Sequence, residues 1–172
     1  MALTAANVLV GVSGSVKTAV TGTTLPTTIA GALDAAFHDL GYISEEGVTE
    51  SNSVETTDIK GWQNGAVVRT IQTGHSYTLK FKMLETNQYS LTTFYNDYTA
   101  GAIEVTGGQG WRGCLVLDVL DGSDPQRIVI PDGQVTEFGD VVYQNGDAIG
   151  YEVTVTCFPD STGVKAYKYV TT

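Results

Sequence analysis

The amino-acid sequence predicts an all-β protein, a β-sandwich or small barrel that carries one short α-helix. Composition is the first observation: of 172 residues, 20 are glycine and many are threonine, and these residues favour strands and turns over helices. The second is the strict alternation of apolar and polar side chains over Ser76–Met83 and again over Ile149–Phe158, which is typical of strands that bury one face. The length suits one domain, 1–172.

The first forty residues predict little regular structure. Two short β-like runs, Val8–Val12 and Val16–Val20, flank a Ser-Gly-Ser step. They form either a first hairpin or a flexible N-terminal arm of about residues 1–15. Apolar residues then recur at nearly helical spacing over Ile29–Leu40, so a turn or two of helix competes with an irregular segment up to Gly41.

An acidic stretch follows this segment. Residues 34–58 contain seven acidic residues and no Lys or Arg, and the Gly, Ser and Asn residues among them favour irregular backbone. We therefore predict a long acidic loop at about residues 41–58. Long loops in compact domains are either functional or mobile, so a solvated loop and a loop that becomes ordered against a partner both stay open.

The next stretch predicts two turns and a hairpin. Gln63–Gly65 supplies the first turn, because Asn-Gly tolerates positive φ at low cost. The β-branched run Ala66–Thr73 and the alternating run Ser76–Met83 then form a hairpin through a second turn at Gly74.

The periodicity changes after this hairpin. Either Thr86 or Asn87 can cap a helix, and aromatic and leucine side chains recur at spacings of two to five instead of strictly two. We predict one short helix over Asn87–Asn96. Its aromatic side is expected to cover an open edge or end of the sheet.

The second half of the chain predicts more strands. Residues 98–113 form a glycine-rich loop that contains Trp111, which is either an exposed interface anchor or, more simply, a buried side chain. The continuously apolar run Cys114–Leu120 predicts a strand covered on both faces. A strand over Arg127–Ile130 is then closed by a turn at Pro131–Gly133.

Three further strands complete the predicted sheet. Val135–Tyr143 is followed by a hairpin turn at Gln144–Asp147 and by the long alternating strand Ile149–Phe158. The last strand, Val164–Val170, places two tyrosines on one face. It suits a sheet edge that pairs with a neighbouring subunit.

Charge and chemistry exclude several classes of protein. With 19 acidic and 9 basic residues the net charge is −10, which argues against a protein that grips nucleic acid through its phosphates. Cys114 and Cys157 lie in apolar runs and are expected to be free core thiols, and His38 and His75 lie in separate contexts. We expect no enzymatic activity, no metal, no cofactor and no membrane association.

Several short runs resemble a known family. They are Leu40–Ser44 with Glu46–Val48, the glycine and tryptophan at Gly61-Trp62, and Phe81–Glu85, within a similarity that is strongest over Leu25–Asn96. This pattern is similar to that of the major tail tube proteins of long-tailed, non-contractile bacteriophages. The resemblance implies a tail-tube fold, six copies closing into a ring, and rings stacking into a tube through which DNA leaves.

The same resemblance implies partners and a location. The partners are other copies of the chain, the tape measure, the tail terminator and the distal tail proteins, with DNA passing through the lumen without specific binding. The location is the virion tail, assembled in the host cytoplasm. An acidic wall suits this role, because it offers phosphates no cationic partner.

Strand alternation and the acidic stretch give candidate interface residues. The expected lumen-facing acids are Glu137, Asp140 and Glu152. The expected inter-subunit or ring-stacking residues are Glu45, Glu46, Glu50, Glu55, Asp58, Trp111, Tyr167 and Tyr169.

Two alternatives stay open on the sequence. One is a β-sandwich adhesin or carbohydrate-binding module, with Trp62, Trp111 and the tyrosines on a ligand face. The other is a secreted tube protein of a phage-related injection system. Self-association without glycan binding distinguishes the tube proteins from the adhesin.

Overall fold

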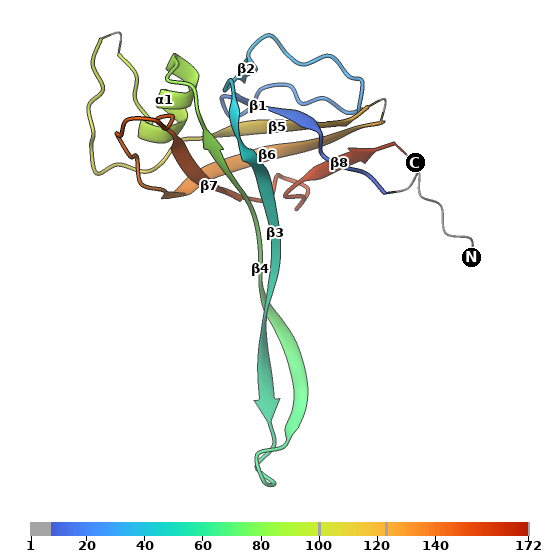
Figure 1. Cartoon of the computed structure of the whole chain (residues 1–172). Helices are drawn as coiled ribbons and strands as arrows, with labels where there is room; N and C mark the ends of the chain where they lie inside the picture. Colours follow the sequence, from blue (N-terminus) through green and yellow to red (C-terminus); the bar gives the residue numbers. More distant parts are fainter. Residues whose placement is uncertain (1–7, 100, 123, 172) are drawn as a thin grey trace.

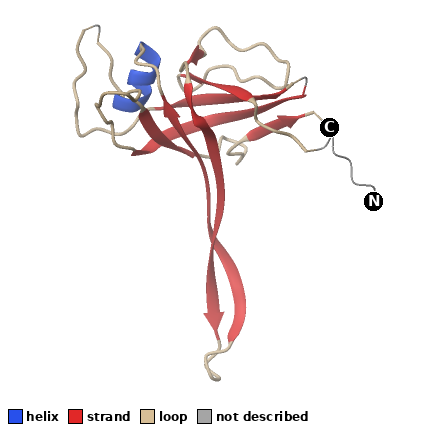
Figure 2. Cartoon of the chain, in the orientation of Figure 1, coloured by secondary structure: helices blue, strands red, loops and turns tan. Residues whose placement is uncertain are grey.

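The computed structural model describes residues 8–99, 101–122 and 124–171, and it confirms an all-β fold with one helix (Figures 1 and 2). The strands form one antiparallel sheet. In chain order the elements are β1 (Ser13–Ala19), β2 (His38–Asp39), β3 (Ile43–Lys60), β4 (Val67–Met83), α1 (Gln88–Tyr95), β5 (Arg112–Asp121), β6 (Asp124–Phe138), β7 (Tyr151–Cys157) and β8 (Tyr167–Val170).

The sheet curls around a single core. Its strand order is β2-β1-β5-β6-β7-β4-β3, and β8 pairs with the first part of β6 while β7 pairs with the last part. Val16 of β1 and Val48 of β3, on strands near opposite ends of this order, pack into the same hydrophobic cluster. The sheet therefore folds back on itself as a small open barrel does, with a seam between β1 and β3.

Alternation along the central strands supplies the core. Leu79 and Phe81 of β4 lie opposite Val155 and Val153 of β7, and all four side chains are buried. The predicted strand Cys114–Leu120 is confirmed within β5, whose residues 114–117 are all buried. Burial of such aliphatic and aromatic side chains contributes about 1.5–3 kcal/mol each relative to exposure.

The predicted helix is confirmed, and an asparagine caps each of its ends. Asn87 is the N-cap, and its Oδ1 accepts hydrogen bonds from the backbone N–H groups of Tyr89 and Ser90, both at 2.9 Å. Asn96 ends the helix in the left-handed conformation, at φ 56°. Phe94 packs edge-on against Tyr151 of β7, so the helix covers one end of the barrel as expected. No helix in the described part of the chain has the length and apolarity needed to span a bilayer.

The predicted acidic loop at about residues 41–58 is wrong. Residues 43–60 form strand β3, which pairs with β4 from Ile43↔Met83 to Lys60↔Val67. The loop was predicted because this stretch lacks apolar alternation. A strand shows that alternation only where one of its faces is buried, and most of β3 is exposed on both faces.

The sequence predicts a hairpin between residues 66–73 and residues 76–83, but in the structure residues 67–83 are the single strand β4, which forms the hairpin with β3. The turn at Gln63–Gly65 is confirmed, and Asn64 and Gly65 both have positive φ, 55° and 66°, as a tight hairpin turn requires. The predicted turn at Gly74 is wrong, because β4 runs through it as one strand opposite Glu55.

Four other sequence-based boundaries are corrected. A helix over residues 29–40 is wrong, and the irregular alternative is confirmed up to β2. The first hairpin is wrong because residues 13–19 form one strand; residues 1–7 of the predicted N-terminal arm lie outside the described residues. The turn at Pro131–Gly133 is wrong because Pro131 sits in a bulge of β6, where its missing N–H costs no ladder bond. The strand predicted over Val135–Tyr143 ends at Phe138.

Candidate inter-subunit interface

A two-stranded arm projects from the barrel. β4 pairs with β7 only over Thr78–Met83, so beyond Thr78 the β3–β4 hairpin leaves the sheet and continues on its own (Figure 1). We call residues 53–76 the arm. From Ser51, opposite Thr78, to the turn at Gly61 the chain extends for ten residues, or about 33 Å.

Exposed apolar side chains lie along this arm. They range from 47% to 98% exposed and have no core to pack into. An isolated two-stranded hairpin is at best marginally stable in water, and exposed apolar surface of this kind marks interaction sites. The side chains are Val54, Ile59, Trp62, Val67 and Val68.

Polar contacts with the C-terminal segment fix the base of the arm. Lys168 of β8 forms an ion pair with Glu50, with Nζ 2.5 Å from Oε2, and the Lys165 ammonium donates to the backbone carbonyl of His75. Behind them Tyr77 is buried, and its pKa is raised by burial and by the neighbouring Glu50 carboxylate. Contacts to both β3 and β4 therefore fix the direction in which the arm leaves the barrel.

The five acids predicted for subunit contacts do not form one patch. Glu45 and Glu46 lie at the seam, Glu50 is at the base of the arm in its ion pair, and Glu55 and Asp58 lie on the arm. Between Glu45 and Asp58 the strand extends for about 43 Å. These five acids therefore lie on different surfaces of the molecule.

Of the three aromatic residues predicted at the interface, Trp111 is in the core. Its side chain is only 8% exposed, within the hydrophobic cluster, so the interface prediction for Trp111 is wrong and the buried alternative is confirmed. Tyr167 and Tyr169 are half-buried on β8, and the Tyr167 hydroxyl donates to Asp160 Oδ2 at 2.6 Å. Trp62 is 98% exposed at the arm tip, whereas Trp111 is buried in the barrel core, so the two tryptophans do not share a ligand face.

The Asp160 carboxylate predicts a specific pH dependence of stability. Hydrogen bonds from the Tyr167 and Thr162 hydroxyls and the Val164 N–H lower the pKa of Asp160 well below its ordinary value. Its stabilisation is therefore complete above about pH 4 and is lost as the pH falls through the lowered pKa. Asp160→Asn is expected to lower the thermal midpoint at pH 7 and to flatten its decline below pH 4.

Thermal unfolding between pH 2 and pH 7 measures this effect. Asp147→Asn is the matched control, because Asp147 lies in an exposed loop and, within the described ranges, accepts hydrogen bonds only from Gln144 and a backbone N–H. Identical pH profiles for Asp160→Asn and the unmodified chain would contradict the assignment.

One of the three predicted lumen acids, Glu152, lies beside lysines. Glu152 of β7 pairs with Lys80 of β4, with Oε1 3.0 Å from Nζ, and Lys82 lies opposite Glu152 in the ladder. Glu137 is exposed on β6 opposite Thr154, and Asp140 is exposed in the following loop. This outer face of β6, β7 and β4 is polar and of mixed charge, so it is not the uniformly acidic wall that the sequence suggested.

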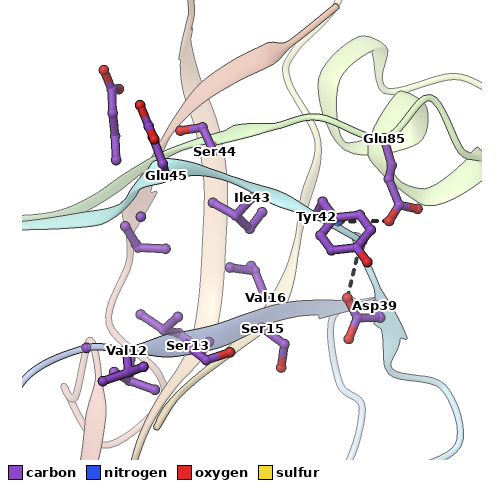
Figure 3. A pocket seen from close by; sticks show the side chains of 18 residues that line it. Val12, Ser13, Ser15, Val16, Asp39, Tyr42, Ile43, Ser44, Glu45 and Glu85 are labelled. Atoms are coloured by element: carbon purple, nitrogen blue, oxygen red, sulfur yellow. Dashed lines mark hydrogen bonds between the residues drawn. The ribbon is translucent and has the colours of Figure 1, made fainter. Parts of the chain in front are cut away.

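A groove lies at the seam between β1 and β3. It has a volume of about 820 Å³ and is lined by residues 11–16, which include the start of β1, and by residues 41–48, which include the start of β3, with Leu117 and Val119 of β5 beneath. Val16 and Ile43 point toward one another across it (Figure 3). Sequence reasoning missed this groove, because it is created by the curl of the sheet.

The arm itself had a signal in the sequence. The turn at Gln63–Gly65 is flanked on both sides by β-branched residues, over 54–60 and 66–73, which is the pattern of a hairpin. The histidines have ordinary local contacts: His38 stacks on Tyr89 with ring centroids 4.0 Å apart, and His75 Nε2 lies 2.7 Å from Asn52 Oδ1.

Comparison with known proteins agrees with this architecture. The model of a protein family described as phage tail tube protein matches residues 1–172, the whole chain. A search among curated proteins found no match. Because the family model spans the entire sequence, the chain belongs to the phage tail tube protein family and has a structural role in the phage tail.

Proposed function

We propose that this protein forms hexameric rings that stack into the tail tube, the conduit for DNA ejection into the host. The observation that carries the proposal is the arm. It is a hairpin that extends for about 33 Å, and its exposed apolar side chains are not covered by the described part of the chain. The family resemblance supports six copies in each ring.

The arm favours contacts that continue from one copy to the next. Its tip and the barrel are different surfaces, so a contact between them on two copies is heterologous and extends into a ring or a filament instead of ending at a dimer. A stack of rings uses both outcomes. Such a contact also explains why only 16% of the residues are charged, since part of the surface is buried by other copies.

Within this proposal the outer face of β6, β7 and β4 lines the lumen. Its threonine-rich ladder contains Thr78, Thr154 and Thr156 and carries paired charges in place of a basic patch. Among the described residues of this face, Lys80 is paired with Glu152 and Lys82 stands without an ion pair, so DNA meets no cluster of free cations there, which suits passage without retention. The proposed partners at the ends of the tube and in its lumen are the tail terminator, the distal tail proteins and the tape measure, with assembly in the host cytoplasm.

Lysine at the three predicted lumen positions is expected to slow or stop DNA ejection while leaving the tubes intact. Glu137→Lys, Asp140→Lys and Glu152→Lys together add three positive charges and remove three negative ones per copy, and they also remove the Lys80–Glu152 pair, so the face gains phosphate-binding sites. Phage carrying the variant would be tested for receptor-triggered DNA release. The corresponding Gln variants are the control, and ejection at the normal rate from the Lys variant would refute the lumen assignment.

Electron microscopy of the purified protein at rising concentration, with light scattering, tests the proposed function. Rings or tubes with an open channel are the expected result. A protein that stays monomeric at every concentration, even when the other tail proteins are supplied, would overturn the proposal.

A further inference from the structure

We propose that the groove at the β1–β3 seam is the receptor for the arm tip of another copy of this chain. This inference rests on the proposed function and adds to it the docking site and the chemistry of the contact. The tip is defined here as residues 59–69, and the groove as the surface between residues 11–16 and 41–48.

Unpaired strand edges make the groove a site for strand addition. β1 pairs with β5 over its whole length but with β2 only at Lys17 and Thr18, so within the described chain no strand pairs with this edge over residues 13–15, whereas at Val16 the backbone carbonyl already accepts a hydrogen bond from the Leu40 N–H. Across the groove, the edge of β3 that faces away from β4 likewise has no paired strand in the described ranges. Bare edges of this kind bind an extended segment through main-chain hydrogen bonds.

A bulge opens the start of β3 further. The pairing register shifts between Ile43↔Met83 and Val48↔Phe81, so residues 44–47 face a single β4 residue and Gly47 has a positive φ of 68°. Such bulges interrupt ladder pairing and redirect side chains. Here the bulge places Glu45 and Glu46 on the rim of the groove.

Charge on the two surfaces is complementary. Four carboxylates border the groove, and none of its described lining residues is Lys or Arg; the carboxylates belong to Asp39, Glu45, Glu46 and Glu85. Asp39 is partly neutralised by Lys17, 3.7 Å away, whereas none of the ion pairs of the described chain includes Glu45 or Glu46. The tip carries Lys60 and Arg69, and neither takes part in those ion pairs.

Apolar surface on the two sides also matches. The groove presents the exposed Val12 and the half-buried Ile43, with the buried Val16 and Leu117 beneath them, while the tip exposes Trp62 and Val68. A volume of about 820 Å³ is large enough to take these side chains with a length of extended backbone. Aromatic side chains surrounded by a charged rim are typical of the residues that dominate interface energetics.

The occupant must come from another copy. From Gly47 at the groove to Gly61 at the tip, β3 is a continuous strand of fourteen residues, which spans about 46 Å. The figure shows the arm pointing away from the barrel (Figure 1). The tip therefore cannot fold back into its own groove without breaking β3.

Charge reversal on each surface, separately and together, tests this docking in the full chain. Lys60→Glu with Arg69→Glu, and Glu45→Lys with Glu46→Lys, are each expected to abolish tubes under conditions in which the unmodified protein polymerises. The chain with all four changes is expected to form tubes again, because the attraction is restored with the signs exchanged. Glu104→Lys with Asp147→Lys, which has the same charge change as the groove variant but lies elsewhere, is expected to polymerise.

Cysteine trapping gives a readout that does not depend on tubes. The Gln63→Cys chain and the Ser13→Cys chain are mixed and oxidised, and a covalent dimer is expected, because Ser13 is exposed in the groove; Gln63→Cys with Asp147→Cys is the control and should give none. The docking would be overturned if both double variants formed tubes, or if the quadruple variant, like the doubles, formed none. The tube function would stand in either case. A monomeric unmodified protein that also gives no covalent dimer would overturn both.

Discussion

Replacing residues 56–73 by an Asn-Gly turn is expected to abolish tube formation and to leave a folded, monomeric barrel. Glu55 and Gly74 lie opposite each other in the β3–β4 ladder, so a two-residue turn can join them. The deleted residues are almost all exposed, and the buried core is contributed by the barrel, from Val16 to Cys157. Assembly loses its projecting element, whereas folding loses very little.

Electron microscopy and thermal unfolding measure the two halves of this expectation. The thermal midpoint should change by only about 1–2 °C, since surface changes alter stability by no more than about 0.5 kcal/mol and each kcal/mol shifts the midpoint by about 2–4 °C at this chain length. A second variant keeps residues 56–73 but replaces Trp62, Val67 and Val68 by Ser. It separates the loss of apolar surface from the loss of arm length. Normal tubes from the shortened chain would show that the arm is dispensable.

Phe81→Ala is expected to destabilise the folded chain by about 3–5 kcal/mol, which is a drop of roughly 6–20 °C in the thermal midpoint. Phe81 is 2% exposed and lies on β4 between Val48 of β3 and Val153 of β7, where removal of the ring leaves a cavity that three paired strands cannot close. Chemical denaturation monitored by tryptophan fluorescence measures the loss. The buried Trp111 reports on the core.

Val68→Ala is the matched control for the core substitution. Val68 lies on the same strand but is 71% exposed on the arm, so its loss should alter stability by less than about 0.5 kcal/mol. Its effect is expected in assembly instead. Equal destabilisation by the two substitutions would mean that the arm and the barrel do not divide the chain as described.

The central strands and the helix could be predicted from the sequence because local chemistry determines them. β7 and the last part of β4 alternate because one face of each is buried, and Asn87 and Asn96 bound α1 through their own side-chain and backbone conformations. Trp111 could not be placed, since its burial depends on how a glycine-rich loop packs against distant strands.

The arm and the groove illustrate the opposite limit. β3 carries no periodic pattern because no face of its outer half is buried, so its acidic residues gave the appearance of a loop. The groove depends on contacts between residues 11–16 and 41–48, which come together only when the seven-strand order curls. No local signal in the sequence encodes that approach.

The continuity of β3 and β4 from the barrel into the arm has a mechanical consequence. A pull on the tip runs along both strands and reaches the β4–β7 ladder parallel to its strands, where six residue pairs, from Thr78↔Thr156 to Met83↔Tyr151, are loaded in shear. Hydrogen bonds loaded in this direction share the force and must yield together, whereas bonds pulled open from one end break in sequence. The body of each subunit therefore resists tension along the arm more strongly than a ladder that is pulled open from one end.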